Sequence, residues 1–317
     1  MKYALFGATG AVGKELANVL AANNRKFRVV GRKLQDLKAT FGRYEPLVEY
    51  CEADLTDAAS ARRAADGIDT LFYLVGVPYD RFDLHPQMSK VCVNAAAEAG
   101  VRKFVHLGTL YSFGRMQREC ITEDHPREPH TFKGRMRKEQ EDIVLGAHGK
   151  NGMQVTILRA PDFYGGDSPL SMLYRVFDAA VKGKTADVIG PIDKPHEFIY
   201  VPDLARTLYQ LSQVDAAYGK GWNIGGAGFI TVKEFSEKIF KRAGSKPKLR
   251  VAGLWTLRLL GLFNPFMREF VEMHYLMTEP LFVYDEALRR LIPELRKTPY
   301  DDGIERTLAF ERARRAP

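Results

Sequence analysis

Short apolar runs alternate with longer amphipathic segments through the first half of the chain. The apolar runs are rich in Val, Ile, Leu and Phe and cover residues 3–7, 27–31, 48–55, 70–77, 103–109 and 154–161. Between them, a helical spacing of apolar residues predicts helices over 11–23, 34–41, 57–66, 87–100 and 133–148. Near-continuous apolar strands are typical of a sheet that is covered on both faces. The alternation therefore predicts an α/β fold with a doubly wound parallel sheet.

The C-terminal region, from about residue 227 onward, has a more helical pattern. An amphipathic helix is predicted over 231–244 and a short strand over 246–253. The most apolar segment of the chain is 251–267, but it is shorter than a membrane-spanning helix and contains Arg258 and Pro265. We expect a substrate lid or a core helix in this segment, and no membrane partner.

The composition is that of a globular protein with a substantial core, since 45% of the 317 residues are hydrophobic. The net charge of +8 raises the question of a nucleic-acid partner. However, the Lys and Arg residues are spread along the chain and no DNA- or RNA-binding motif accompanies them. We therefore expect anionic small ligands and no nucleic acid.

The cysteines and the N-terminus bear on the location of the protein. The three cysteines have neither disulfide nor zinc-site spacing, so we expect no metal site. The first predicted strand begins at residue 3, without the features of a secretion signal. This favours a cytoplasmic location.

The first strand is followed by a glycine-rich turn, GATGAVG, that leads into a helix. Glycines at this spacing allow the backbone to approach a pyrophosphate, and N–H groups at the start of the helix can bind its oxygens. The turn therefore predicts a dinucleotide site. Its predicted binding residues are Gly7, Thr9, Gly10, Ala11, Val12 and Gly13.

The end of the second strand indicates which dinucleotide is bound. Where an acidic residue would bind the ribose 2′-hydroxyl of NAD(H), the chain has Gly31, followed by Arg32 and Lys33. Guanidinium and ammonium groups attract a 2′-phosphate, which a carboxylate would repel. This favours NADP(H) over NAD(H), although Arg32 and Lys33 could instead begin a solvated helix. After the third strand, Asp54, followed by Leu55, could bind the adenine amino group or cap the next helix.

In this order, the motifs resemble the extended or atypical short-chain dehydrogenases/reductases, the NAD(P)-dependent epimerase/dehydratase kind. The matching stretches are FGATGAVG (6–13), ADL (53–55), FYLVGVP (72–78), KFVHLGTLYSFG (103–114), LRAPDFYGG (158–166), EFIYVPDLAR (197–206) and GWNIGG (221–226). The resemblance implies that Val75, Gly76, Ala160 and Pro161 lie along the cofactor. It also implies two domains. These are a Rossmann domain over 1–163 and 196–226, and a smaller, mostly helical substrate-binding domain over 164–195 and 227–317.

The family's active-site pattern is retained only in part. Thr109 matches the catalytic Ser/Thr of the family, whose hydroxyl binds the reacting oxygen. The family's next element is Tyr-x-x-x-Lys with a glutamate four residues later, and the matching residues here are Lys133, Arg137 and Glu141. A spacing of i, i+4 and i+8 places all three on one face of a helix. The resemblance implies that Arg137 can bind the ribose, whereas the proton-transferring tyrosine of the family is replaced.

Three side chains are candidates for the missing acid/base group. Lys133 lies close to Arg137 on the predicted helix, and like charge and desolvation would both favour the neutral amine, which accepts a proton. Tyr111 and Tyr164, which follow the fifth and sixth strands, are the others, and no tyrosine lies between them. Each has an ordinary alternative. Both tyrosines can be packing residues, and Lys133 can belong to a solvated basic face on which Glu141 pairs with Arg137.

Two functions of different classes agree with these residues. The first is an oxidoreductase that uses NADP(H) on a carbonyl, enone or alcohol of an apolar small molecule. The second is a catalytically silent protein that binds NADP(H) and reports redox state to a partner. A nucleotide-sugar epimerase or dehydratase agrees less well, because the Asp-Glu pair that dehydratases carry beside the threonine is absent from GTLYSF (108–113). The helices over 87–99 and 133–148 resemble those through which family members dimerise, which implies a homodimer.

Overall fold

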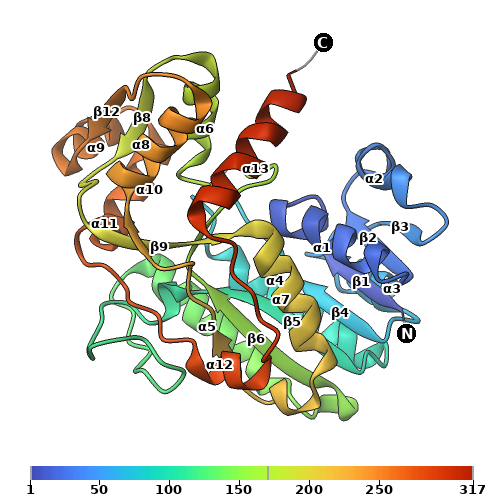
Figure 1. The fold of residues 1–317 in the computed structure, drawn as a ribbon. Helices are drawn as coiled ribbons and strands as arrows, with labels where there is room; N and C mark the ends of the chain where they lie inside the picture. Colours follow the sequence, from blue (N-terminus) through green and yellow to red (C-terminus); the bar gives the residue numbers. More distant parts are fainter. Residues whose placement is uncertain (1, 170, 316–317) are drawn as a thin grey trace.

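A computed structural model describes residues 2–169 and 171–315 (Figure 1). The strands are β1 (Tyr3–Phe6), β2 (Phe27–Gly31), β3 (Val48–Glu52), β4 (Thr70–Tyr73), β5 (Lys103–Thr109), β6 (Gln154–Ala160), β7 (Asp162–Tyr164), β8 (Ala186–Ile189), β9 (Pro195–Tyr200), β10 (Gly221–Asn223), β11 (Phe229–Thr231) and β12 (Leu249–Ala252). The helices are α1 (Ala11–Ala22), α2 (Leu34–Phe41), α3 (Ala58–Ala65), α4 (Leu84–Glu98), α5 (Phe132–Gly146), α6 (Tyr174–Lys182), α7 (Val201–Gln213), α8 (Val232–Ala243), α9 (Leu254–Gly261), α10 (Pro265–Met273), α11 (Tyr275–Thr278), α12 (Glu286–Leu291) and α13 (Tyr300–Ala313).

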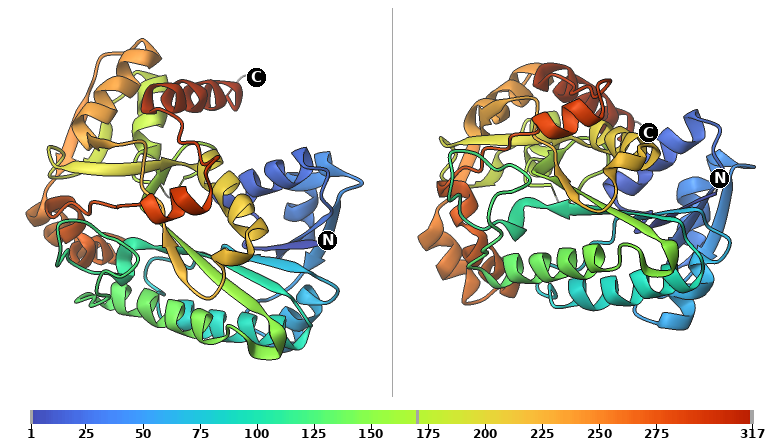
Figure 2. Two further views of the ribbon diagram at one scale, coloured as in Figure 1. Left: turned by 60° about the horizontal axis from the view of Figure 1, so that its bottom comes forward. Right: turned by 90° about the horizontal axis from the view of Figure 1, so that it is seen from below.

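A seven-stranded parallel sheet forms the centre of the fold, with the strand order β10-β6-β5-β4-β1-β2-β3. Six of its strands are the predicted apolar runs, and β10 extends one edge. Helices α1, α2 and α7 bury their apolar sides on one face of the sheet, and α3, α4 and α5 cover the other (Figure 2). Because both faces are covered, each strand can be apolar along its whole length. The predicted doubly wound parallel sheet is confirmed.

Smaller sheets and most of the later helices lie beyond the main sheet, at the upper left of Figure 1. They are the three-stranded sheet β11-β9-β7 and the parallel pair β12-β8. Helices α6, α8 and α13 pack around them on a separate apolar core that includes Phe177, Phe198, Phe235 and Leu308. This core includes side chains from both 164–195 and 227–317. The domain boundaries stated above stay a prediction.

The apolar segment 251–267 does not form a core helix. Only Leu257 of α9 is buried, whereas Trp255 and Leu259 are exposed. The expectation of a core helix is therefore wrong for α9, because its apolar side chains face away from the rest of the chain. In the part of the chain that the structure describes, none of the helices combines the length and the apolar character needed to cross a membrane.

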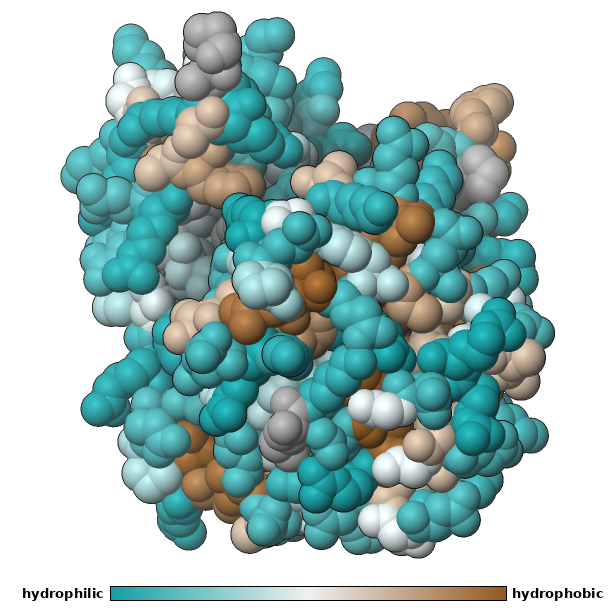
Figure 3. All heavy atoms as spheres, turned by 90° about the vertical axis from the view of Figure 1, so that its right-hand side faces the viewer, coloured by the Kyte–Doolittle hydropathy of each residue, from teal (hydrophilic) through white to brown (hydrophobic). Residues whose placement is uncertain are grey.

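The carboxyl ends of the parallel strands share one edge of the sheet, and this edge determines where a site can form. Residues at the ends of β1, β4, β5 and β6 lie next to one another in the sheet register. The N-terminus of α1 begins at the same edge, after the turn that follows β1. Ligands of open α/β sheets bind at such an edge. The face of the molecule that carries α1, α2 and α3 is mainly hydrophilic, with small, separated apolar patches (Figure 3).

Candidate active site

The turn after β1 has no room for a side chain at two of its glycines. Gly7 has a φ of +88°, and a Cβ atom on it would lie 2.7 Å from the carbonyl oxygen of Leu74. A Cβ atom on Gly13 would lie 2.4 Å from the carbonyl oxygen of Ala8. None of the described side chains caps α1 after Gly10, so N–H groups of its first turn can bind an anion. This geometry fits the pyrophosphate of a dinucleotide at the predicted turn.

The ends of β2 and β3 border a polar hollow of about 360 Å³, which fits the adenosine end of a dinucleotide. Its lining residues are Arg32, Glu52, Ala53, Asp54, Ser60 and Arg63. The carboxylate of Asp54 accepts hydrogen bonds from the N–H (2.9 Å) and the hydroxyl (2.7 Å) of Thr56, which lower its pKa. Asp57, not Asp54, caps α3 by accepting from the N–H of Ser60 at 2.7 Å. The hollow therefore brings together Arg32 and Asp54, two of the residues predicted for the cofactor.

Glu52 also lines this hollow. It was not predicted, because the acidic residue of an NAD(H) site was sought at the end of the second strand and Glu52 ends the third. It ends β3 and is the register partner of Gly31, the last residue of β2. Its carboxylate accepts a hydrogen bond from the N–H of Leu34 at 2.8 Å, directly after the exposed Arg32 and Lys33. An acidic group is thus present near the ribose end of the hollow, although it comes from the neighbouring strand.

Thr109 lies at the opposite end of the predicted cofactor path. It is the last residue of β5 and the register partner of Ala160, the last residue of β6. Its hydroxyl oxygen accepts a hydrogen bond from the N–H of Tyr111 at 3.4 Å. Its own hydrogen can therefore still be donated to a ligand. Because β4 pairs with β5, the segments 75–76 and 160–161 and Thr109 all lie at the same edge of the sheet.

Tyr111 belongs to a cluster of polar side chains at this edge. Tyr79, from the loop after β4, donates a hydrogen bond to the Tyr111 hydroxyl. Burial and the charge of Asp162 raise the pKa of Tyr111, while the Tyr79 hydrogen bond and the charge of Arg137 lower it, and burial prevails. The phenol is therefore neutral at physiological pH. A neutral phenol near a carboxylate and a cation can donate a proton to a bound substrate.

Asp162 is the second titratable group of this cluster. It follows Ala160 and Pro161 directly and begins β7. Burial raises its pKa to about 6. A carboxyl group with this pKa can both accept and donate a proton near neutral pH. The sequence analysis did not single out Asp162 or Tyr79, although both adjoin segments predicted to contact the cofactor.

Lys133 is buried at the start of α5, and it faces opposite charges. Its ammonium group forms ion pairs with Glu269 and, at 3.0 Å, with Glu272, both on α10. Its backbone N–H also donates to Glu272 at 3.1 Å, and the ammonium lies 5.0 Å from the ring centre of Tyr79. The charges in contact with the ammonium are thus two carboxylates, and not the like charge of Arg137 that the acid/base hypothesis assumed. Because the side chain is only 1% exposed, the interpretation as a solvated basic face is wrong.

Arg137 lies one turn after Lys133 and is half-buried. Its guanidinium donates to the side-chain oxygen of Gln140 at 2.8 Å and lies 5.4 Å from the ring centre of Phe82. Burial lowers its pKa to about 10, so the group stays cationic at neutral pH. Its charge acts on Tyr111, and the predicted contact with a ribose stays a prediction.

Glu141 does not pair with Arg137. Its carboxylate accepts from Arg159 at 2.8 Å, from the hydroxyl of Ser112 at 2.8 Å and from Arg127 at 3.2 Å. These bonds connect α5 with the end of β6 and with the segment after β5. Glu141 therefore stabilises the edge of the sheet on which Thr109 lies.

Tyr164 is a packing residue, so its assignment as a candidate acid/base group is wrong. Its side chain is fully buried in the core around α6, α8 and α13. Its ring lies 5.0 Å from that of Phe235, edge to face, and 5.4 Å from that of Tyr200. Gly303 packs directly against its hydroxyl, because a Cβ atom there would lie 2.2 Å from that oxygen. A substrate has no access to the hydroxyl in this packing.

Replacing Asp162 with asparagine is expected to change the pH dependence of stability. Because the pKa of Asp162 is raised from 3.8 to about 6 in the folded protein, the fold binds this proton more tightly than the unfolded chain does. The carboxyl group therefore favours folding at low pH, and this contribution is lost as pH rises through about 6, by about 1–3 kcal/mol. Urea unfolding should show the stability of wild type relative to Asp162→Asn falling between pH 4 and pH 7. A pH-independent difference would contradict the burial. The pKa of Asp54 is lowered from 3.8, so the stability of wild type relative to Asp54→Asn should instead rise with pH, below about pH 4.

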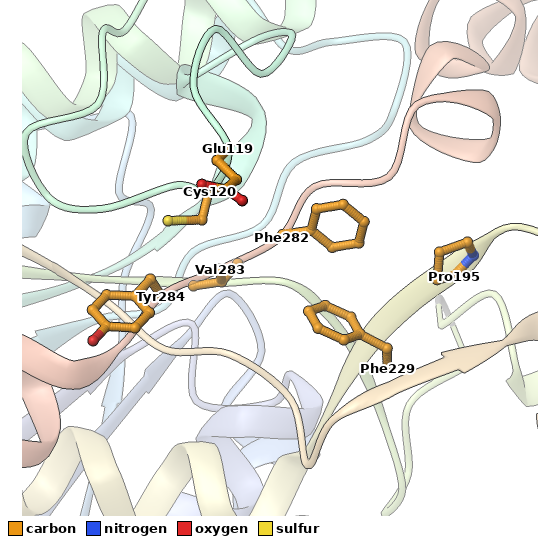
Figure 4. A pocket seen from close by; sticks show the side chains of 7 residues that line it. All are labelled: Glu119, Cys120, Pro195, Phe229, Phe282, Val283 and Tyr284. Carbon is orange, nitrogen blue, oxygen red and sulfur yellow. The ribbon is translucent and has the colours of Figure 1, made fainter.

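An apolar groove of about 530 Å³ lies where the segment after β5 crosses the segment before α12. Its lining residues are Glu119, Cys120, Pro195, Phe229, Phe282, Val283 and Tyr284 (Figure 4). The rings of Phe229 and Phe282 meet edge to face at 4.9 Å. Backbone hydrogen bonds from Ile121 to Phe282 and from Tyr284 to Ile121 hold the two segments together. None of the residues considered above for cofactor or catalysis lines this groove.

Known proteins share this fold and parts of this sequence. An uncharacterized protein, y4nG, of Sinorhizobium fredii is 26% identical over 253 residues, which cover 77% of this chain and 61% of that protein. A 3 beta-hydroxysteroid dehydrogenase/Delta 5→4-isomerase of Mycobacterium tuberculosis is 24% identical over 270 residues, which cover 78% of this chain and 71% of that protein. The crystal structure of a dTDP-glucose 4,6-dehydratase from Streptomyces venezuelae, with NAD and TYD bound, has a TM-score of 0.83 at 18% identity and covers 99% of this chain and 98% of that one.

The family itself follows from a match over most of the chain. The sequence model of the NAD dependent epimerase/dehydratase family matches residues 4–225, which include the glycine turn, Thr109, Tyr111 and Asp162. The structural likeness, at 18% identity, shows the same fold over the full length. The chain belongs to the NAD dependent epimerase/dehydratase family, whose members are extended short-chain dehydrogenases/reductases.

Proposed function

We propose that this chain is an oxidoreductase that uses NADP(H) on a carbonyl, enone or alcohol of an apolar small molecule. The observation that supports this most directly is the neighbourhood of Thr109, Tyr111 and Asp162 at the edge of the sheet where the glycine turn forms a nucleotide cradle. The cofactor supplies or accepts a hydride when bound. The residues that would hold its pyrophosphate are those of the turn at 7–13, and 75–76 and 160–161 would line the nicotinamide end.

In this proposal Tyr111 supplies the proton that accompanies hydride transfer. Thr109 donates a hydrogen bond to the substrate oxygen, because the bond that its hydroxyl oxygen accepts from the N–H of Tyr111 leaves its own hydrogen available. When a carbonyl is reduced, the hydride adds to its carbon and the Tyr111 proton passes to its oxygen. Asp162, with a pKa of about 6, can return a proton to the phenolate, and the charge of Arg137 stabilises that phenolate in the interim.

An apolar substrate is supported by the aromatic side chains around the cluster. The ring of Tyr79 stacks on that of Phe270 at 5.0 Å and meets that of Phe82 edge to face at 5.2 Å. Apolar walls with a few polar groups are typical of small-molecule sites. The relative from Mycobacterium tuberculosis is named as a hydroxysteroid dehydrogenase, a class of enzyme that acts on such ligands.

Preference for NADP(H) is expected to depend on Arg32. Replacing Arg32 with alanine removes one of the two guanidinium groups that line the hollow. It should weaken NADPH binding about 10–100-fold while leaving NADH binding unchanged within about twofold. Fluorescence titration with both cofactors measures this, with Lys38→Ala on the following helix α2 as control. The proposal of NADP(H) would be abandoned if wild type bound NADH more tightly, as Glu52 favours and as the NAD in the dehydratase structure suggests.

The alternative is a catalytically silent protein that senses NADP(H). One observation favours it: the residue at the position of the family's tyrosine, Lys133, is bound to Glu269 and Glu272. A panel of apolar aldehydes, ketones and enones, tested for oxidation of NADPH, separates the two functions. Turnover on any member supports the enzyme, whereas tight binding with no turnover on all members supports the sensor.

We also propose a homodimer formed through α4 and α5. These helices lie side by side on one face of the sheet (Figure 2), and Phe132 at the start of α5 is 44% exposed. Sedimentation equilibrium with Phe132→Glu as the disrupting variant tests this proposal. A cytoplasmic location stays a prediction.

A further inference from the structure

Among the described residues, the large apolar side chains with the highest exposed fractions lie on α9 and the turn after it. Trp255, Leu259, Leu262 and Phe263 are 79%, 62%, 76% and 85% exposed. Their spacing of i, i+4, i+7 and i+8 is that of one side of a helix, and we call them the apolar stripe. Each other large hydrophobic residue found exposed among the described residues has a smaller exposed fraction than any of these four. A cluster of this kind marks a surface that binds something.

The charge around the apolar stripe indicates what it binds. Residues 238–268 contain eight Lys or Arg and no Asp or Glu, so this segment carries +8, a value equal to the net charge of the whole chain. Lys238 and Arg242 pair with Asp301, Arg250 pairs with Asp187, and Arg268 lies 4.0 Å from Glu269. In the described part of the chain no carboxylate forms an ion pair with the other four cations of the segment, namely Lys241, Lys246, Lys248 and Arg258. Although Lys and Arg residues occur along the whole chain, the excess of cations over carboxylates is concentrated in this segment.

We propose, in place of the expectation of no membrane partner, that α9 and the turn after it bind the surface of a membrane that contains anionic lipids. Apolar and aromatic side chains flanked by cations are the pattern of a helix that lies in the interface without crossing the bilayer. A second copy of this surface would bring like charge against like charge, so charge complementarity favours an anionic partner. The guanidinium of Arg258 over the Trp255 ring, at 5.1 Å, combines the two kinds of group that occur at the headgroup level.

The position of the apolar stripe connects it to the candidate active site. Helix α10 follows α9 directly and packs against it. The same α10 holds Lys133 through Glu269 and Glu272, and its Phe270 stacks on Tyr79. A ligand dissolved in a membrane would thus meet α9 first and the aromatic wall of the site next. The inference goes beyond the proposed function, and its test requires no substrate.

The two tryptophans of the chain make a direct measurement possible. Trp222 is buried, and its ring N–H donates to the carbonyl of Ala217, so a change in its surroundings on vesicle binding is not expected. Trp255 is exposed and belongs to the stripe. When vesicles of phosphatidylcholine with about 30% phosphatidylglycerol are added, the tryptophan emission should therefore shift to the blue and the protein should sediment with the vesicles. Added salt should weaken both effects. Vesicles of phosphatidylcholine alone should bind at least about tenfold more weakly.

Variants assign the binding to the stripe and to the cations separately. Leu259→Ser/Leu262→Ser/Phe263→Ser keeps the reporter Trp255 and should reduce vesicle binding about tenfold or more. Lys246→Glu/Lys248→Glu should reduce binding to anionic vesicles without altering the apolar stripe. Phe229→Ser/Phe310→Ser removes exposed aromatic rings elsewhere and should leave binding unchanged. The proposal is overturned by the absence of binding to either vesicle, by equal binding to neutral vesicles, or by a wild-type dimer that the triple serine variant dissociates.

Discussion

Replacing Tyr111 with phenylalanine is expected to reduce turnover about 10²–10⁴-fold, the range typical of losing a general acid. The change removes only the hydroxyl that Tyr79 and the charges of Asp162 and Arg137 surround. Cofactor affinity should stay within about threefold of wild type, because the glycine turn and the adenosine hollow are unchanged. Initial rates on the best substrate of the panel, together with NADPH titration, measure both quantities.

A matched control and a second variant sharpen this prediction. Tyr218→Phe removes the hydroxyl of a half-buried tyrosine that donates to the carbonyl of Ser212 at 2.9 Å, so it tests the loss of a phenol away from the site and should leave turnover unchanged. Tyr79→Phe removes the hydrogen bond that lowers the pKa of Tyr111, so the alkaline limb of the pH–rate profile should move to higher pH. Full activity of Tyr111→Phe would exclude this tyrosine as the proton donor.

Replacing Lys133 with methionine is expected to lower the free energy of unfolding by about 2–4 kcal/mol. The methionine leaves Glu269 and Glu272 without their common cation and beside each other, with about a quarter of each side chain exposed. Urea unfolding at pH 7 measures this loss. The control is Lys138→Met, which breaks an exposed pair with Asp142 and should cost about 0.5 kcal/mol or less.

A second variant distinguishes this structural role from catalysis. In Lys133→Met, any loss of turnover would come from displacement of α10 by its two unpaired carboxylates. Removing these charges as well, in Lys133→Met/Glu269→Gln/Glu272→Gln, should therefore restore much of the stability and much of the turnover. If Lys133→Met abolished turnover with unchanged stability and cofactor affinity, and the triple variant stayed inactive, Lys133 would be the acid/base group after all.

The fold could be predicted because its requirements are local. Strands covered on both faces are apolar throughout, and helices between them repeat at helical spacing, so both are visible in short windows of sequence. The glycine turn is also visible in a short window, since its three glycines lie within residues 7–13 and the room that Gly13 lacks is taken by the backbone of Ala8. Exposure of α9 could not be predicted in this way. Its apolar composition suits a core, and only the packing of the chain shows that the side chains face outward.

The chemistry of the site was less accessible because it depends on distant residues. Lys133 and its partners Glu269 and Glu272 are 136 and 139 positions apart, so the sign of the charge around the ammonium could not be read from the helix on which it lies. Tyr164 was a reasonable candidate from its place after the sixth strand, but β7 directs it into the second core. Asp162, two positions earlier, is instead the residue whose charge acts on Tyr111.

The central claim is that a hydride moves between the bound cofactor and a carbonyl, and isotope transfer tests it most directly. The protein would be incubated with NADPH that carries deuterium at the transferable position of the nicotinamide C4 and with the apolar carbonyl panel, and products would be analysed by mass spectrometry. The account predicts a product alcohol, or a saturated ketone from an enone, that contains one deuterium, and strongly reduced labelling in Tyr111→Phe. Tight NADPH and NADH binding with no deuterium in any product would contradict the account and favour a protein that senses the cofactor.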